Sequence, residues 1–345
     1  MQQRVSLPDL GVLRLQGPDA ARFLQGQLSS DVMRLPGRPG QLAGYHNPQG
    51  RAIALLRLVQ VAPDDILAVL PRELAAAVAS RLSRFVLRAK VRISDASAEW
   101  QVSGISADAA TSAPRTPAGA ATAATTAAPA APAAPAATAT TATTAAPSTS
   151  DGSWRMPFGS DGLHWLELTP AANGTPGSRE EQSLQVWRRY EIAAGEPQIR
   201  AATSEEFVAQ MLNLDALDAI AFDKGCYTGQ EVIARAHYRG RVKRRMQRFQ
   251  SDEPCQLAPG DSGRLADGRP FKVVQSVQLA DGRSEFLAVT ALETGEEGAK
   301  LARADSTVAD SNAVAIATAQ STVADSTSGP VLKATALPLP YTLPD

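Results

Sequence analysis

The sequence is poor in the residues that cross-link proteins or anchor them in membranes. It has two cysteines, Cys226 and Cys255, aromatic residues make up only 5% of it, and its formal net charge at pH 7 is −1. Two cysteines and no secretory pattern argue against a disulfide-built extracellular protein. No run approaches the roughly 20 apolar residues of a membrane span, and a near-neutral chain is not drawn to nucleic acid or membranes as a whole. The composition therefore predicts a cytoplasmic protein without a membrane partner.

Two segments of low complexity lack the large side chains of a hydrophobic core. Residues 107–150 consist mostly of alanine, threonine and proline, and residues 293–328 repeat Ser-Thr-Val-Ala-Asp-Ser. Scattered prolines prevent a continuous helix, and a segment without large apolar side chains cannot offset its ordering entropy. We expect 107–150 to be a disordered insertion and 293–328 to be a long loop.

The N-terminal part, residues 1–106, mixes strand and helix patterns. Asn47-Pro48-Gln49-Gly50 predicts a hairpin turn before an apolar strand at 52–59. Pro71 can open a helix that runs to about Phe85. Residues 86–93 alternate apolar and basic side chains, which predicts a half-buried strand. This mixture is typical of the α+β class.

The second half continues in the same way before its character changes. Residues 151–238 show a strand at 163–168 and helices at 181–191 and 205–211. Short strands punctuated by glycine and aspartate follow in 239–292, which predicts a small antiparallel β-barrel. The β-rich residues 329–343 are expected to return as a final barrel strand.

The stretch most suggestive of chemistry is Lys224-Gly225-Cys226-Tyr227-Thr228-Gly229-Gln230-Glu231. Two glycines bracket the cysteine, a lysine precedes it, and a helix is expected from Glu231 onwards, with that acid in its first turn. A cysteine beside a lysine and near a helix N-terminus is a candidate low-pKa thiolate. The alternative is a small apolar residue in a tight turn.

The other candidate ligands are sparse. A protein-owned iron–sulfur cluster normally needs four cysteines, so no permanently bound metal is expected, and Cys226 is at most a transient cluster ligand. Cys255 lies in an expected loop and is taken as incidental. His46, His164 and His237 lack metal-ligand spacing.

Several motifs together resemble the YgfZ folate-binding proteins, members of the superfamily of the glycine-cleavage aminomethyltransferase (T-protein). The motifs are Leu24-Gln25-Gly26-Gln27-Leu28-Ser29-Ser30-Asp31-Val32, Tyr45-His46-Asn47-Pro48-Gln49-Gly50-Arg51, Gly195-Glu196-Pro197 and the cysteine octapeptide 224–231. The resemblance implies a multi-domain α+β fold of the aminomethyltransferase type with a C-terminal antiparallel β-barrel. It also implies tetrahydrofolate binding and a role in the synthesis or repair of iron–sulfur clusters. Such a role supports iron–sulfur enzymes that modify tRNA, such as the methylthiotransferase.

The resemblance also assigns roles to residues. The family's essential cysteine corresponds to Cys226, with Lys224 beside it. The expected folate contacts are Tyr45, Gly225, Tyr227, Gly229, Gln230 and Glu231.

One departure separates this chain from the aminomethyltransferases. Those enzymes carry an acidic residue at the start of the strand that corresponds to 50–58, whereas this chain reads Arg51-Ala52-Ile53-Ala54-Leu55. Without that acid, transfer of an aminomethyl carbon lacks its evident proton handler. An accessory, non-enzymatic role is therefore favoured, and a tetrahydrofolate-dependent one-carbon transferase with a relocated acid is the alternative.

The basic run from Arg239 to Arg245 has three interpretations: solvated strand ends, a phosphate contact for tRNA, and an anchor for the glutamate carboxylates of folate. The carboxylate anchor, through Arg239 and Arg241, is favoured over direct tRNA binding. Trp187 and Arg188 are candidate pterin contacts, although a helix tryptophan is more often a core residue. The chain is expected to act as a monomer.

Overall fold

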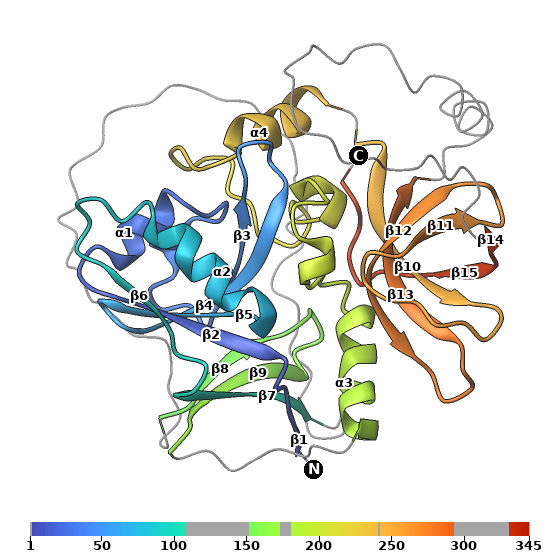
Figure 1. Cartoon of the computed structure of the whole chain (residues 1–345), viewed down its shortest axis with the longest axis horizontal. Coiled ribbons are helices and arrows are strands. Elements are labelled where there is room, and N and C mark those ends of the chain that lie inside the picture. Colours follow the sequence, from blue (N-terminus) through green and yellow to red (C-terminus); the bar gives the residue numbers. More distant parts are fainter. Residues whose placement is uncertain (1, 108–151, 173–180, 241, 293–330, 345) are drawn as a thin grey trace, which may run out of the picture.

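A computed structural model describes residues 2–107, 152–172, 181–240, 242–292 and 331–344. Its strands form three sheets, and the first two lie together while the third lies on the far side of α3 (Figure 1). The third sheet still shares the largest core cluster with the first, through residues such as Met246 and Val289. The two low-complexity segments lie outside the described residues, apart from Ala107. No helix in the described ranges is long and apolar enough to cross a membrane.

The first sheet has five antiparallel strands in the order β3-β4-β5-β2-β6. Its strands are β2 (Leu10–Gln16), β3 (Gln41–His46), β4 (Ala52–Ala62), β5 (Asp65–Pro71) and β6 (Arg92–Asp95). Two helices pack near it, α1 (Ala20–Gln25) and α2 (Arg72–Ser83). β4 and β5 are buried along most of their length, so this sheet forms the centre of the largest hydrophobic core. The hairpin predicted at 47–50 is confirmed by the antiparallel pairing of β3 with β4.

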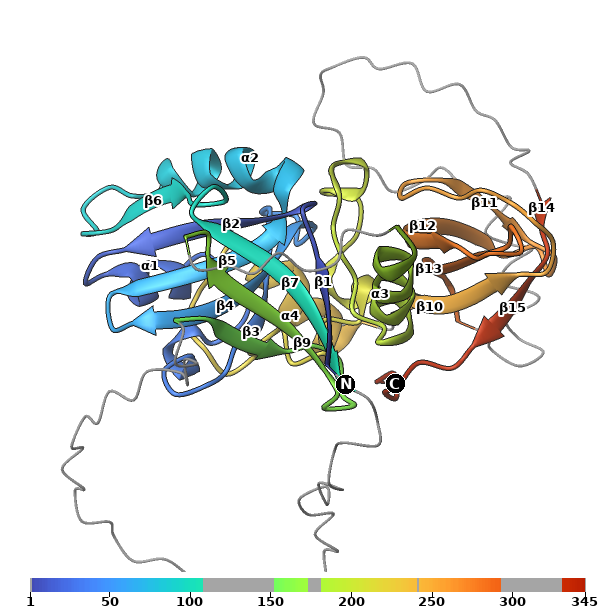
Figure 2. The same ribbon diagram turned by 90° about the horizontal axis from the view of Figure 1, so that it is seen from below.

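The second sheet has four antiparallel strands in the order β1-β7-β9-β8, and α3 lies at its end (Figure 2). These elements are β1 (Gln2–Ser6), β7 (Trp100–Ala107), β8 (Trp154–Pro157), β9 (His164–Pro170) and α3 (Glu181–Ala193). A second core cluster joins this sheet to β2, β4 and β5 through Trp154, Leu166, Trp187 and neighbouring apolar residues.

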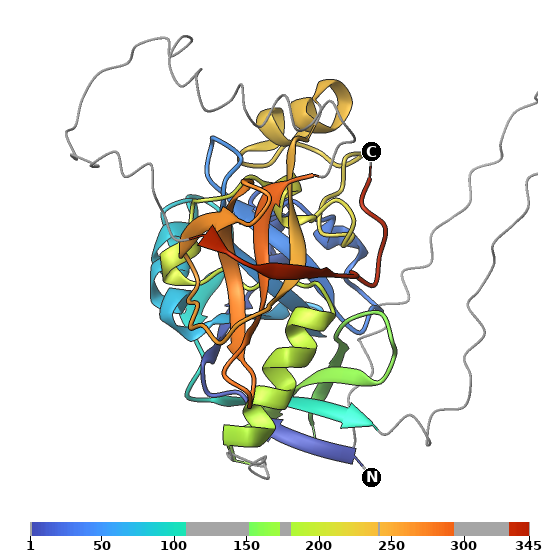
Figure 3. The same cartoon turned by 90° about the vertical axis from the view of Figure 1, so that its right-hand side faces the viewer.

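The third sheet is a nearly closed, barrel-like arrangement of six strands in the order β14-β11-β12-β13-β10-β15. The strands are β10 (Arg244–Ser251), β11 (Ser262–Leu265), β12 (Pro270–Gln278), β13 (Ser284–Ala291), β14 (Val331–Leu332) and β15 (Ala334–Leu337). Figure 3 looks onto this sheet, with β15 crossing in front of it and α3 beside it. The last segment enters the sheet as two short strands: β14 pairs in parallel with β11, and β15 pairs antiparallel with β10.

Two expected elements take a different form. The strand expected at 86–93 is reduced to β6, because Val86, Ala89 and Val91 turn towards the core at irregular spacing and the chain pairs with β2 only from Arg92 onwards. The helix expected at 205–211 is replaced by 3-10 turns at Ala201–Thr203 and Ala209–Leu212. Between them Glu205 adopts φ 64° and its N–H donates to the carbonyl of Ala52, and this left-handed residue breaks the helix.

Candidate functional site

Cys226 lies in an exposed loop that leads directly into α4 (Gln230–Arg239). Gly229, at the helix N-cap, has φ 83°, a left-handed conformation that suits glycine. Glu231 lies in the first turn of α4, as the sequence predicts, and is exposed. The loop therefore presents its thiol to solvent just ahead of a helix.

Lys224 fastens this loop to the segment that follows α1. Its Nζ donates hydrogen bonds to the carbonyl oxygens of Gln25, Leu28 and Ser30, at 2.7, 2.7 and 2.8 Å. Burial lowers the pKa of the Lys224 ammonium to about 8. An ammonium has three N–H donors, so these three carbonyls engage all of them and none is left for the sulfur of Cys226. Lys224 therefore positions the loop.

The β3–β4 turn supports the other end of the loop. A Cβ on Gly229 would lie 2.6 Å from the carbonyl oxygen of Asn47 and 3.0 Å from Cα of Gly50. Gly50 in turn faces Val232 and Ile233 of α4. The Asn47 side chain shapes the turn, because its Oδ1 accepts from the N–H groups of Gln49 and Arg51. The N-terminal end of α4 thus packs directly against the backbone of the turn.

The structure brings three sequence motifs together. The segment 24–32 receives Lys224, the turn within 45–51 supports Gly229, and the loop 224–231 joins them with Cys226 exposed between its two attachments. In Figure 1 the turn between β3 and β4 reaches the start of α4. The convergence forms a rigid platform for one exposed thiol.

The other folate contacts predicted near Cys226 differ in their burial. Tyr45 and Tyr227 are buried in the large core, at 3% and 7% exposure, and the Lys224 ammonium lies 5.0 Å from the centre of the Tyr227 ring. Gly225 is exposed, with no atom within 4 Å of a Cβ placed on it. Gln230, half-buried, donates its backbone N–H to the carbonyl of Tyr227.

The remaining predicted contacts lie farther along the chain. Trp187 is 2% exposed in the second core and donates its Nε1–H to Glu191 at 2.9 Å, so it occupies a core position. Arg188 pairs with Asp9 at 3.5 Å. Arg239 is exposed at the end of α4, and Arg241 lies outside the described residues.

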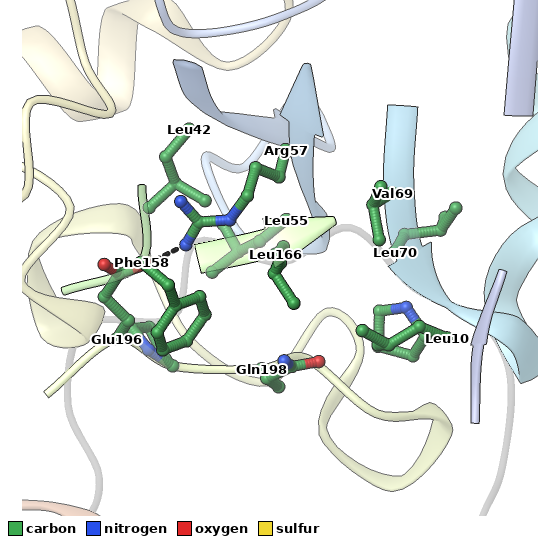
Figure 4. Close-up of a pocket in the computed structure, with 12 residues that line it drawn as sticks. Leu10, Leu42, Leu55, Arg57, Val69, Leu70, Phe158, Leu166, Glu196 and Gln198 are labelled. Carbon is green, nitrogen blue, oxygen red and sulfur yellow. Dashed lines mark hydrogen bonds and ion pairs between the residues drawn. The ribbon is translucent and has the colours of Figure 1, made fainter. Parts of the chain in front are cut away.

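A second site, which the sequence does not predict, lies between the first two sheets. Arg57 of β4 and Glu196 form an ion pair with both side chains 12% exposed, and the backbone N–H of Gly159 also donates to Glu196, at 2.7 Å. Figure 4 shows the two side chains pointing towards one another in a cleft. The cleft is lined mainly by apolar side chains, among them Leu55, Val69, Phe158 and Leu166.

The cleft is small. It encloses about 30 Å³, and its free space reaches about 380 Å³ only when the part open to solvent is included. The enclosed part has room for about one water molecule. A larger ligand would therefore place only an edge inside it.

A buried carboxyl group lies behind this cleft. Glu191 of α3 is 3% exposed and accepts hydrogen bonds from Trp187, Gln198 and Gln275. Burial raises the pKa of Glu191 to about 7. Because Gln198 also lines the cleft and Gln275 belongs to β12, Glu191 connects the cleft to the barrel-like sheet.

Sequence signals for the second site exist but are weak. Arg57 interrupts the otherwise apolar run 52–59, and Glu196 lies inside the Gly195-Glu196-Pro197 motif. Neither residue shows by itself that the two meet, because 139 positions separate them. Within the described residues, no group of three or more histidine, cysteine, aspartate or glutamate side chains could hold a metal ion.

The fold places the chain in a known structural class. The crystal structure of the glycine cleavage system aminomethyltransferase T from Bartonella henselae matches it with a TM-score of 0.57 at 11% identity, over 84% of this chain and 78% of that one. The chain thus has the aminomethyltransferase fold, with the barrel-like sheet at its C-terminal end, and both expectations are confirmed.

Sequence relatives define the family more narrowly. No family model matches the chain. A Klebsiella pneumoniae protein named tRNA-modifying protein YgfZ is 30% identical over 295 residues, 81% of this chain and 82% of the relative. Proteins of the same name from Enterobacter sp. and Serratia proteamaculans are each 29% identical over 81% of this chain, and over 82% and 81% of their own lengths. The chain belongs to the YgfZ family.

Proposed function

We propose that this protein binds a reduced folate and uses the Cys226 thiol to support the synthesis or repair of iron–sulfur clusters. The clients would be iron–sulfur enzymes that modify tRNA, such as a methylthiotransferase. The observation that carries the proposal is the rigid attachment of an exposed cysteine, held at one side by Lys224 and at the other by the 47–50 turn. A thiol presented in this way is accessible to a protein partner.

The cleft supports the folate part of the proposal through its chemistry. A pterin ring has adjacent N–H donors on one edge, and such an edge pairs with a carboxylate in two-point geometry. Glu196 supplies a carboxylate, Phe158 an aromatic face and Arg57 a cation in one apolar cleft. The carboxylate acceptor of Glu196 thus suits the N–H donors of the ring edge, while the small enclosed volume leaves the rest of the cofactor outside. When bound, a reduced folate would supply one-carbon or reducing chemistry.

Cys226 supports the iron–sulfur part as a transient ligand or sulfur carrier. A cluster needs several cysteine ligands, and the chain has only Cys226 and Cys255. We therefore treat the cluster as cargo that Cys226 shares with a client, with no resident metal of its own. The protein would act in the cytoplasm as a monomer, and direct tRNA binding is disfavoured.

An alternative function, one-carbon transfer onto folate, remains open because of one observation. β4 carries no acid, but Glu196 places a carboxylate in the cleft beside Arg57. Glu196 would be the relocated acid that such a transferase requires. Incubation of the purified protein with tetrahydrofolate and an aminomethyl donor decides between the two functions: turnover supports the transferase, and binding without turnover supports the accessory role.

The folate site is tested by calorimetric titration of tetrahydrofolate into the wild-type protein and three variants. We expect Glu196→Gln to weaken binding by at least about tenfold, because the charge-assisted pairing is lost. Cys226→Ala should bind like the wild type. Glu206→Gln, which alters an exposed ion pair with Lys272, is the matched control and should also bind normally. Equal affinity for Glu196→Gln and the wild type would exclude this cleft.

The thiol role is tested in cells that lack the native protein. Methylthiolated tRNA nucleosides are quantified by mass spectrometry after complementation with the wild type, Cys226→Ala or Cys255→Ala. We expect Cys226→Ala to restore little modification and Cys255→Ala to restore it fully. Full rescue by Cys226→Ala would contradict a working thiol at this position.

A further inference from the structure

Residues 84–92, which connect α2 to β6, expose apolar side chains that no part of the described chain covers. Val86, Ala89 and Val91 of this segment pack against the large core, so its inward positions are already filled. Phe85 and Leu87 point outwards and are 52% and 86% exposed. A large aliphatic side chain exposed to this degree gains nothing within the monomer, and exposed apolar groups with a polar rim are typical of interaction sites.

The same segment carries an uncompensated positive charge. Its four cations, Arg84, Arg88, Lys90 and Arg92, are all exposed. None of them forms an ion pair with any residue in the described part of the chain, whereas Arg14, Arg34, Arg57, Arg155 and Arg248 are all paired. The charge of the segment is therefore available to an external partner.

The backbone of the segment is held in place. The N–H of Lys90 donates to Oδ2 of Asp19 at 2.7 Å, and the N–H of Asp19 approaches the carbonyl of Lys90 at 3.4 Å. Gly17 packs so closely that a Cβ there would lie 2.1 Å from the same carbonyl oxygen. The outward residues therefore stand on a fixed support, which lowers the ordering cost of binding.

We propose that residues 84–92 form a docking surface for a partner protein whose own surface is acidic around an apolar recess. Leu87 and Phe85 would fill the recess, and the four cations would face the acidic rim. Aromatic residues and arginine are both enriched at protein interfaces, and this segment exposes Phe85 together with three arginines. The proposal does not depend on folate binding or on the Cys226 thiol.

A protein fits these features better than RNA or a lipid surface. Phe85 has a π face on which a base could stack, but Leu87, the most exposed large apolar residue in the described part of the chain, has none and gains free energy only by apolar burial. Stable attachment to a membrane requires a broad amphipathic face, whereas this segment exposes two apolar residues on an irregular backbone. An acidic protein surface accommodates both the aliphatic anchor and the cations.

The surface lies beside the platform that carries Cys226. Asp19, which holds Lys90, precedes α1, and Gln25 at the other end of α1 accepts from Lys224. The six residues of α1 span about 9 Å at 1.5 Å per residue. The length of α1 therefore separates the docking surface from the segment that receives Lys224 of the cysteine loop.

The test uses the full-length protein with the photo-crosslinking amino acid p-benzoylphenylalanine at position 87, expressed in its own cells. The matched control carries it in place of Val186, which is 59% exposed on α3. We expect a protein adduct at position 87 with a yield at least about five times that of the control, mapped by mass spectrometry to a peptide flanked by acidic residues. Arg84→Glu with Arg88→Glu should lower the yield about tenfold, whereas Arg72→Glu, at the opposite end of α2, should not change it.

Several results would overturn the proposal. They are an adduct that ribonuclease digests, an adduct to lipid, an adduct to a second copy of the chain, and equal yields at positions 87 and 186. Binding of the purified partner then provides a second measurement: Leu87→Asp should weaken it at least about tenfold and Val186→Asp should not. Thermal melting of both variants verifies that they are folded.

Discussion

The Cys226 loop and the Arg57–Glu196 cleft differ in how they hold their reactive groups. The loop exposes its thiol and fixes it through backbone contacts, with the Lys224 ammonium on three carbonyls and Gly229 against the turn. The cleft keeps its charged pair mostly buried and fixes it through the ion pair itself, the backbone N–H of Gly159 and the backbone carbonyl of Pro157. The first arrangement suits a group that must reach another macromolecule, and the second suits recognition of part of a small ligand.

Attachment and the proposed chemistry are carried by different residues in the loop and by the same residues in the cleft. In the loop, Cys226, the proposed working thiol, is exposed, and the residues that hold the loop, Lys224 and Gly229, are half-buried. In the cleft, the same side chains, Arg57 and Glu196, serve both purposes. Substitutions should therefore separate stability from reactivity in the loop and should not do so in the cleft.

The largest expected effect concerns the attachment of the loop. Lys224→Met removes three charge-assisted hydrogen bonds and leaves three carbonyls without their donor, so the free energy of unfolding should fall by about 3 kcal/mol. Urea denaturation measures the change. The control is Lys272→Met, which breaks an exposed ion pair with Glu206 and should cost less than about 1 kcal/mol. A change below 1 kcal/mol for Lys224→Met would show that water replaces the ammonium.

The pH dependence of Glu191 should distinguish the cleft region from the loop. Its pKa of about 7 in the folded protein lies above the ordinary value of 4.5. The stabilisation from its protonated form is therefore complete below about pH 4.5 and is lost as the pH rises through 7. At about 1.4 kcal/mol per pKa unit, Glu191→Gln should gain roughly 3 kcal/mol over the wild type between those two pH values.

Urea denaturation at a series of pH values measures this gain, and a pH-independent difference would contradict the assigned pKa. The charged residues that act on Glu191 are Asp9 and Arg200, which lie outside α3, and Arg188, which lies on the same helix.

The fit between the loop and the turn should be sensitive to a single methyl group. Gly229→Ala places a Cβ 2.6 Å from the Asn47 carbonyl at φ 83°, which should cost about 2 kcal/mol. Gly225→Ala, in the same loop, meets no atom within 4 Å and should change the stability by less than about 0.5 kcal/mol. Equal melting temperatures for the two variants would show that the turn does not support α4 tightly.

The smallest effect is expected at the thiol itself. Cys226→Ser should leave the free energy of unfolding within about 0.5 kcal/mol of the wild type, because the side chain is exposed. Maleimide labelling of the native protein should modify Cys226 faster than the half-buried Cys255. A large loss of stability in Cys226→Ser would show that the cysteine has a structural role.

The sequence predicts much of the local structure because the signals are themselves local. The turn at 47–50, the helix after Pro71 and the helix after Gly229 each follow from residues within a few positions of one another. Prediction from the sequence fails where tertiary contacts determine the conformation of a segment. The basic alternation at 86–93 suggested a strand, but attachment to Asp19 and packing of Val86 and Val91 hold most of it as an irregular segment.

The roles of individual site residues show the same division. The octapeptide alone identified Cys226 and placed Lys224 near it, because both lie in one short motif. That the ammonium binds carbonyls 194 to 199 positions away, instead of facing the sulfur, is a tertiary fact. Likewise the sequence suggests Trp187 as a ligand contact because it is a large aromatic residue. The structure buries it in the core, where Gly104 leaves room for its ring.

The sequence by itself determined the family and the class of fold, and it singled out Cys226 as the candidate thiol, because these inferences depend on motifs whose residues are neighbours in the chain. Only the tertiary structure decided that three separate motifs form one platform, that Arg57 meets Glu196, and that Phe85 and Leu87 face outwards. Each of these depends on closing loops of tens to hundreds of residues, and the summed packing of the whole chain determines such closures.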